Sequence, residues 1–366
     1  MMKSVWKLKR AVIGTLMIRS TSICAQKSFD KLSASRRCCF GSDLLSVCVI
    51  ILSLLMLGFS PRCSFAAPSG GVTKAAAQAS SIDLHFPSHP VGKIYKVEVL
   101  KNGLTTRPTV GDKSWIARGD ISLDPAQAIL FTMNYAGSEN SSFLEGMSNA
   151  NVVVLDMNNL ENVNDETFKH ISKLTQLRRI LSNGTDLSDE GMKYLKPLKN
   201  LSTLVANGSL IKGPGLSVLA ELPELRYLEL ARSAMRGCDF SKLAPLKKIV
   251  AIDLSGCALT DTVCMYLNQM HTMIFLNIAK NKITDEGISH LVNLNHLTEI
   301  NLINTAVTPR AALSLAKLPM LQHVILGENQ FSEPAVLRFK KALPKCSVEL
   351  RKSDDKIDAN VFAPLR

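Results

Sequence analysis

The sequence is poor in aromatic residues, and this scarcity excludes one class of partner. Phe, Tyr and Trp together make up 5% of the 366 residues, and only two of them are tryptophan. Proteins that bind single-stranded nucleic acid stack the bases on aromatic side chains beside a basic groove. The body of the chain has neither feature. We therefore expect no nucleic-acid partner.

Motifs that carry catalysis or metal binding are also missing. The sequence has no C-x-x-C, no H-E-x-x-H, no G-x-S-x-G and no phosphate-binding glycine loop. His85 and His89 are four residues apart, but Pro87 and Pro90 argue against the helix that would align them as metal ligands. We therefore expect no enzymatic activity, no cofactor and no metal site.

The N-terminal end differs in composition from the rest of the chain. Of the net charge of +12, only +4 remains beyond residue 66, because residues 1–66 hold ten of the 43 basic residues and two of the 31 acidic ones. An apolar run at 44–59 follows two arginines and precedes the small-residue sequence Ser64-Phe65-Ala66, which is typical of a cleaved secretory signal. The run is short for a membrane span, which needs roughly 20 residues.

These features predict export to the periplasm, the cell envelope or the extracellular space. Residues 1–66 are then either a cleaved signal or a retained anchor, and membrane contact is limited to 44–59 in the second case. A cytoplasmic location is the remaining alternative. Residues 67–81 are small, polar and rich in Gly and Ala, which indicates a flexible linker.

Residues 82–150 have no clear repeat, but they alternate like short strands at 93–100, 121–123 and 128–133. We interpret this region as a small, mostly β N-terminal cap. An independent β domain with its own ligand is the alternative.

Residues 151–344 contain eight repeats of one pattern of about two dozen residues. The copy at 273–296, MIFLNIAKNKITDEGISHLVNLNH, has aliphatic residues at positions 1, 4, 6, 11, 16, 19 and 22. Positions 1 to 6 have the spacing of a strand, and positions 16 to 22 have that of a buried helix face. One repeat buries too little apolar surface to offset its conformational entropy, so the repeats must stack. The repeats begin at Val152, Leu177, Leu201, Leu225, Ile249, Met273, Leu297 and Leu321.

Two polar columns mark the turns of each repeat. Position 9 carries short side chains that can satisfy backbone groups where the strand ends: Thr185, Ser209, Ser233, Cys257, Asn281, Thr305 and Asn329. Position 12 carries preferred helix N-caps: Asn164, Ser188, Thr260, Thr284, Thr308 and Ser332. Four caps precede an acidic residue that the helix dipole favours: Asp165, Asp189, Asp261 and Asp285. In repeats three and four, residues 212–214 and 236–238 replace this signal, so their helices should be short or irregular.

The pattern L-x-x-L-x-L-x-x-T-x-I-T-D-x-G-L-x-x-L-x-x-L resembles the leucine-rich repeats of many bacterial proteins. It is similar to those of the ribonuclease-inhibitor and F-box substrate-recognition groups. The resemblance covers about half the chain and implies a right-handed α/β horseshoe solenoid, with a concave parallel sheet and convex helices. Residues 345–366 would supply a C-terminal cap strand and a polar tail.

The resemblance also indicates where a partner would bind. Strand side chains at positions 2, 3, 5, 7 and 8 face away from the core, and we expect those of the concave face to be open to a partner. Tyr227 and Phe275 resemble interface anchors with a polar rim; the alternative is that they only cover their neighbours. The candidate binding residues are Arg179, Arg226, Tyr227, Glu229, Asp253, Phe275, Asn277, Glu299, Asn301 and His323.

The sequence therefore predicts an exported, monomeric, non-catalytic protein that recognises another protein through its concave face. A structural or scaffolding protein of the cell envelope is the alternative. Four of the nine cysteines lie in the body, at 238, 257, 264 and 346. Their positions in the repeats hold them too far apart for a bridge, so we expect four free thiols.

Overall fold

The computed structural model describes residues 81–101, 103–109, 111–328 and 331–352, all within the compact unit Ala76–Arg366. The predicted signal, nearly all of the predicted linker and the predicted tail from 353 lie outside the described residues. Within the described residues, no helix is long and apolar enough to cross a membrane.

A sheet of 12 strands runs through the described part of the chain, in the order β14-β13-β12-β11-β10-β9-β8-β7-β6-β5-β2-β3. Consecutive repeats pair in parallel and in register, so that Ala251 lies beside Phe275 and Phe275 beside Glu299. The repeat strands are β6 (Val152–Asp156), β7 (Arg179–Leu181), β8 (Thr203–Val205), β9 (Tyr227–Glu229), β10 (Ala251–Asp253), β11 (Phe275–Asn277), β12 (Glu299–Asn301), β13 (His323–Gly327) and β14 (Ser347–Arg351).

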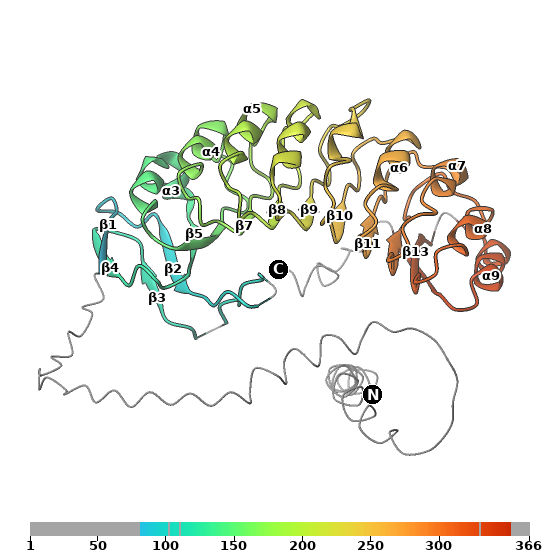
Figure 1. The fold of residues 1–366 in the computed structure, drawn as a ribbon, viewed down its shortest axis with the longest axis horizontal. Coiled ribbons are helices and arrows are strands. Elements are labelled where there is room, and N and C mark those ends of the chain that lie inside the picture. The colour runs from blue at the N-terminus through green and yellow to red at the C-terminus, as the bar shows by residue number, and fades with distance from the viewer. Residues whose placement is uncertain (1–80, 102, 110, 329–330, 353–366) are drawn as a thin grey trace, which may run out of the picture. The chain divides into compact units, whose positions relative to one another are not determined.

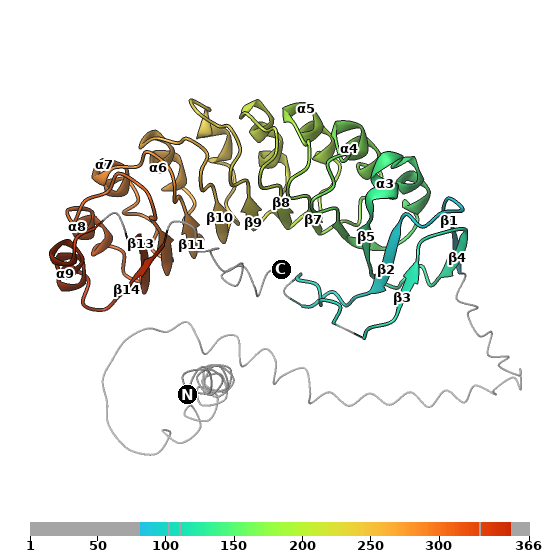
Figure 2. The same ribbon diagram turned by 180° about the vertical axis from the view of Figure 1, so that it is seen from behind.

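Short helices return the chain from each strand to the next, and they cover the convex side while the strands line the concave side (Figures 1 and 2). They are α4 (Asp165–Ile171), α5 (Asp189–Met192), η2 (Lys193–Leu195), η3 (Pro214–Glu221), η4 (Phe240–Leu243), α6 (Thr262–Leu267), α7 (Asp285–Ser289), α8 (Ala311–Leu315) and α9 (Glu333–Ala342). Repeats three and four have the 3-10 helices η3 and η4, which confirms that they are irregular.

The N-terminal region is mostly β and continues the sheet of the repeats. β5 pairs in parallel with β6, and β2 pairs antiparallel with β5 and β3. A separate ribbon of β1 and β4 packs nearby, and Phe86, Phe131 and Phe143 contact one another beneath it. The elements are β1 (Ile82–His85), β2 (Gly92–Lys96), β3 (Ser114–Ile116), β4 (Asp120–Leu123), β5 (Ile129–Met133), α3 (Tyr135–Glu139) and η1 (Ser142–Met147).

One continuous hydrophobic core runs from this region to the last strand. It extends from Leu84 to Val348, and strand residues such as Leu276 are fully buried in it. Since the core of each repeat is closed only by its neighbours, the stacked repeats form one body.

The column at position 9 satisfies backbone groups as predicted. The Asn281 side chain accepts hydrogen bonds from the backbone N of Cys257 and of Leu259, and its Nδ2 donates to three backbone carbonyls. Thr185 and Thr305 each donate to a backbone carbonyl three residues earlier. The last member of the column, Asn329, lies outside the described residues.

The aspartates at the helix starts join neighbouring repeats. Asp261 Oδ1 accepts from the backbone N of Thr284 at 2.7 Å, and Asp261 Oδ2 accepts from Thr284 Oγ1 at 2.6 Å. Thr284 in turn caps α7, because its side chain accepts from the N of Glu286. Asp165 and Asp285 make the same pair of bonds to Ser188 and Thr308. The repeated Thr-Asp pair is therefore an inter-repeat bridge as well as a helix start.

The glycine of the same motif gives this bridge its space. A Cβ placed on Gly287 would lie 2.3 Å from Asp261 Oδ1, and one on Gly191 would lie 2.1 Å from Asp165 Oδ1. Both distances are far inside van der Waals contact. The T-D-x-G sequence therefore combines an N-cap, a carboxylate for the next repeat and room for the carboxylate of the previous repeat.

Candidate functional site on the concave face

Two rows of side chains cross the concave face, one residue per strand. Row A, at the third position of each repeat, contains Val154, Arg179, Thr203, Tyr227, Ala251, Phe275, Glu299 and His323. Row B, two residues further along each strand, contains Asp156, Leu181, Val205, Glu229, Asp253, Asn277, Asn301 and Ile325. Parallel strands lie only about 4.8 Å apart, so neighbouring side chains of a row are in contact range.

The structure corrects the expectation that all of these side chains are open to a partner. Five of the ten candidate residues are buried: Arg179, Glu229, Phe275, Asn277 and Asn301. In-register stacking is the physical reason, since each side chain is flanked by the equivalent residues of two neighbouring strands. Of the other five, His323 is exposed, and Arg226, Tyr227, Asp253 and Glu299 are half-buried.

The two aromatic candidates form one apolar cluster in row A. Phe275, which is 5% exposed, packs with Ala251, and the half-buried Tyr227 packs against the same pair. Burial raises the pKa of the Tyr227 phenol, which is therefore neutral at ordinary pH. A second apolar cluster, Ala279, Ile303 and Ile325, lies further along the face.

Beside these clusters, row B holds carboxylates bonded to amides. Asn277 Nδ2 donates to Asp253 Oδ2 at 2.8 Å, and Asn207 Nδ2 donates to Glu229 Oε2 at 2.9 Å. Burial, with a smaller contribution from the nearby Glu229, raises the pKa of Asp253 to about 6, against the effect of the hydrogen bonds from Ser255 and Asn277. This stretch therefore changes charge at mildly acidic pH.

The accessible charges lie at the rim and toward the C-terminal repeats. Arg226 Nη2 lies 3.7 Å from Glu224 Oε2, in a partly exposed ion pair. Burial raises the pKa of Glu299, while the positive charges of His323 and Arg351 oppose the shift. A half-buried tyrosine with charged groups around it has the composition of an interface anchor and its polar rim.

A loop that the sequence analysis missed covers the N-terminal end of the face. The segment between β2 and β3 makes a local hairpin, in which Val99 pairs with Thr105 and the N of Thr106 donates to the carbonyl of Glu98. Its Thr105 Oγ1 accepts from Arg179 Nη1 at 3.1 Å. A cavity of about 320 Å³ opens beside it, between this loop and the row residues of β6 to β8.

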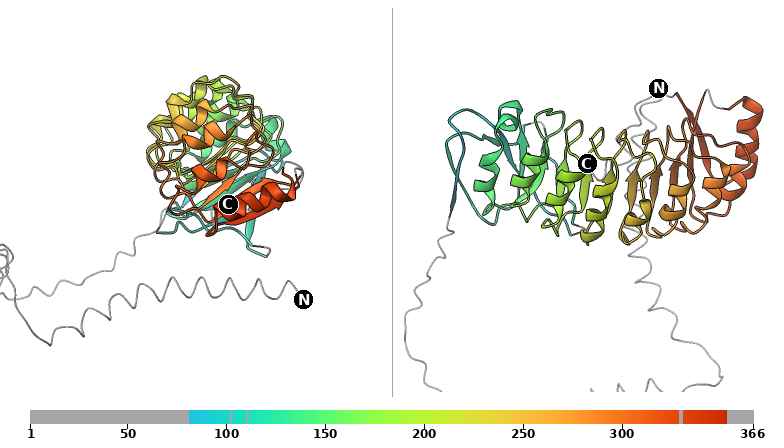
Figure 3. Two further views of the ribbon diagram at one scale, coloured as in Figure 1. Left: turned by 90° about the vertical axis from the view of Figure 1, so that its right-hand side faces the viewer. Right: turned by 90° about the horizontal axis from the view of Figure 1, so that it is seen from above.

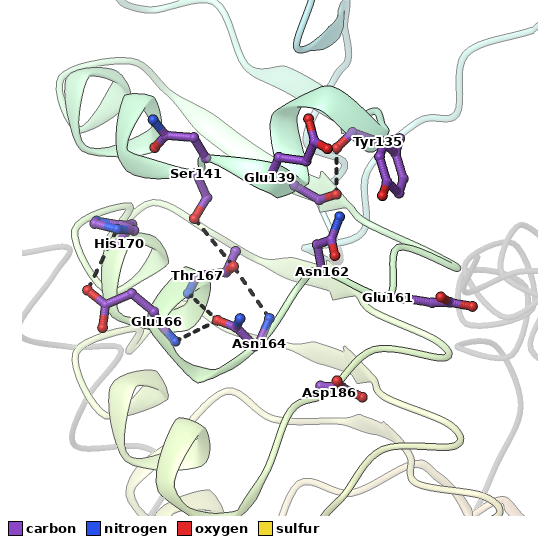
Figure 4. Close-up of a pocket in the computed structure, with 12 residues that line it drawn as sticks. Tyr135, Glu139, Ser141, Glu161, Asn162, Asn164, Glu166, Thr167, His170 and Asp186 are labelled. Atoms are coloured by element: carbon purple, nitrogen blue, oxygen red, sulfur yellow. Dashed lines mark hydrogen bonds and ion pairs between the residues drawn. The ribbon is translucent and has the colours of Figure 1, made fainter.

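A second, larger hollow lies at the side of the first repeats, between α3, η1 and α4 (Figure 4). It has a volume of about 550 Å³, and its lining includes Glu139, Glu161, Glu166 and Asp186 but no lysine or arginine. His170 Nδ1 lies 2.9 Å from Glu145 Oε1 at its edge. Within the described residues, no group of three or more His, Cys, Asp or Glu side chains has an arrangement that could hold a metal ion.

Comparison with known proteins agrees with the repeat architecture. A family model described as Leucine Rich repeat matches residues 269–292, which overlap the sixth repeat and α7. The fold is a leucine-rich repeat solenoid. No curated protein matches the chain. The finer similarity to the ribonuclease-inhibitor and F-box groups stays a prediction.

Two solved structures similar to this chain come from bacteria. An internalin from Listeria monocytogenes is 20% identical, with a TM-score of 0.41 over 57% of this chain and 64% of that chain. A leucine-rich repeat protein from Leptospira interrogans is 18% identical, with a TM-score of 0.40 over 57% of this chain and 62% of that chain. The chain thus spans less than two thirds of the length of either protein.

Proposed function

We propose that this leucine-rich repeat protein is an exported, non-catalytic recognition protein that binds another protein on its concave face. The observation that carries the proposal is the half-buried Tyr227, which packs against the buried Ala251 and Phe275 in the same row. A tyrosine partly held by an apolar base is already restricted in its rotamers, so it loses little entropy when a partner covers it.

The surroundings of Tyr227 support the same function. Arg226 precedes Tyr227 in the chain and Asp253 lies on the neighbouring strand, and both are half-buried. Glu299 and His323 are paired on the strands of the C-terminal repeats. A polar rim around a central aromatic excludes water from the anchor when the partner binds. We therefore assign contact with the partner to Arg226, Tyr227, Asp253, Glu299 and His323. The buried members of rows A and B have a supporting role.

Site-specific photo-crosslinking tests the proposal. A photo-reactive amino acid is placed at His323 on the concave face, and a matched one at Leu313, which is 68% exposed on α8 of the convex side. We expect a discrete protein to be captured from cell-envelope extracts at His323 alone. The additional substitution Tyr227→Ser should reduce that capture at least tenfold.

Capture of the same proteins from both faces, or capture unaffected by Tyr227→Ser, would contradict the proposal. Export is tested separately by fractionating cells and sequencing the N-terminus of the mature protein. We expect a mature chain that begins near Ala67, outside the cytoplasm.

A further inference from the structure

The guanidinium of Arg179 is buried on the concave face, and among the described residues it forms no ion pair. Arg179 is 3% exposed. Its Nη1 donates to the neutral hydroxyl of Thr105, and its Nε is buried without a hydrogen-bond partner. Asp156 and Glu229, on the neighbouring part of the sheet, are nevertheless close enough to favour its charged form.

An unpaired buried charge is costly, and the surroundings increase this cost. Removing a charged group from water costs several kcal/mol unless an opposite charge and hydrogen bonds replace the water. Burial, with a second contribution from the positive charge of Arg107, lowers the pKa of Arg179 to about 10. Asp156 and Glu229 act in the opposite direction but do not outweigh these effects.

Arg179 lines the cavity of about 320 Å³ beside the loop, and Arg107 lines it from the loop itself. Much of the remaining wall is apolar, with Leu130, Val154 and Leu181 among its members. The cavity also contains two amides, of which Asn183 Nδ2 donates to Asn158 Oδ1 at 2.8 Å and fixes the pair. A ligand in this cavity would therefore meet two arginines, one carboxyl group and apolar surface.

We propose that this cavity binds a carboxylate attached to an apolar group, such as the end of a peptide or an acidic side chain beside an apolar one. The carboxylate would lie against the Arg179 guanidinium, which is suited to paired hydrogen bonds with a planar anion. The inference rests on the proposed function in one respect, since it names the chemistry of one part of the partner that the concave face recognises.

A monoanion fits this cavity better than a phosphate does. Asp156 lines the same cavity and would repel a dianion more strongly than a single negative charge. Burial raises the pKa of Asp156, while the hydrogen bonds from Asn158 and the charge of Arg179 oppose the shift. The apolar wall would also remain wet beside a small inorganic ion, because phosphate has no apolar part to cover it.

The test measures binding of small probes to the whole chain by nuclear magnetic resonance titration. N-acetyl-leucine supplies a terminal carboxylate, N-acetyl-glutamyl-leucinamide supplies a side-chain carboxylate, and N-acetyl-leucinamide is the neutral control. We expect at least one acid to bind, in the roughly millimolar range of so small a ligand, and at least tenfold more tightly than the neutral amide. The acid that binds more tightly identifies the source of the carboxylate.

Variants then locate the site. Arg179→Gln should weaken binding of the preferred acid at least tenfold, and Arg179→Lys should restore part of it. Arg310→Gln, which removes an exposed arginine at the start of α8, outside the cavity lining, should leave the affinity within about twofold. Equal binding of acid and amide by the wild-type chain, or phosphate binding at least as tight as that of the acids, would overturn the inference.

The comparison of acid with amide needs no variant, so a folding defect in Arg179→Gln would leave the inference testable. Failure here is also distinct from failure of the proposed function. If His323 still captures a protein that depends on Tyr227 while no acid binds, the carboxylate site is wrong and protein recognition stands.

Discussion

The bridge between Asp261 and Thr284 gives the sharpest test of how the repeats hold together. The Asp261 carboxylate accepts two hydrogen bonds from the next repeat, at 2.7 Å and 2.6 Å. Hydrogen bonds to a charged group contribute about 1.5–3 kcal/mol each. Without the carboxylate, the backbone N and the Oγ1 of Thr284 also lose their acceptor. We expect Asp261→Ala to lower the free energy of unfolding by about 3–5 kcal/mol.

The glycine of the same motif, Gly287, allows a second test of the bridge. Replacing a helical glycine by alanine normally stabilises a protein by about 0.5–1 kcal/mol. At Gly287 the added Cβ would lie 2.3 Å from Asp261 Oδ1, so Gly287→Ala should instead destabilise, by about 1–3 kcal/mol. In the Asp261→Ala background the carboxylate is gone, and Gly287→Ala should become neutral or stabilising.

Urea unfolding followed by far-UV circular dichroism measures all four chains of this double-mutant cycle. Glu286→Ala is the matched control, because Glu286 has the same charge but is exposed, and it should change stability by about 0.5 kcal/mol or less. The bridge would be refuted if Gly287→Ala stabilised the wild-type chain or cost the same in both backgrounds.

Four further predictions follow from burial. Leu276→Ala should cost about 2–5 kcal/mol in thermal unfolding. Asn277→Ala should cost about 1–3 kcal/mol, because it leaves Asp253 without its amide donor; a cost near zero would contradict the burial of row B. The pKa of Asp253 in the folded chain, about 6, exceeds the ordinary value of 3.8. The contribution of Asp253 to the free energy of unfolding should therefore fall as the pH rises from about 4 to about 6. Asp253→Asn should remove this pH dependence. Burial raises the pKa of Cys257 and of Cys264 to about 12, so iodoacetamide should spare both in the native chain and modify both after denaturation; resistance after denaturation would indicate a disulfide.

The repeat architecture could be predicted from the sequence because it depends on spacing within about two dozen residues. The predicted repeat starts at Leu225, Ile249 and Met273 each lie two residues before an observed strand, and the predicted caps Asn164, Ser188 and Thr284 all accept backbone hydrogen bonds. Periodicity reports which side chains face the core, and capping is a local property.

The sequence predicted which residues lie on the concave face, but it did not predict which of them are buried. Its exposure depends on residues far away in the sequence, such as Thr105, which lies 74 positions before its partner Arg179. No local pattern encodes the loop that brings Thr105 there. The role of Asp261 was missed for a similar reason. The helix dipole alone already explains an aspartate at the start of a helix, and only the stacking of the repeats brings Asp261 to Thr284.

The bridges are not distributed evenly along the solenoid, and this has a mechanical consequence. Asp165, Asp189, Asp261 and Asp285 each bond to the following repeat, whereas repeats three and four have Gly213 and Gly237 at the equivalent position. Near these glycines, Cys238 Sγ donates to the carbonyl of Lys212, and no carboxylate occupies the position of the aspartates.

Repeats three and four lie between the two groups of bridged repeats, and Figure 3 shows the repeats in sequence from above. Elastic deformation concentrates where the joints are weakest. We therefore expect the helical side of the solenoid to flex more easily at repeats three and four than in the bridged repeats on either side, while the continuous sheet limits the motion on the concave side.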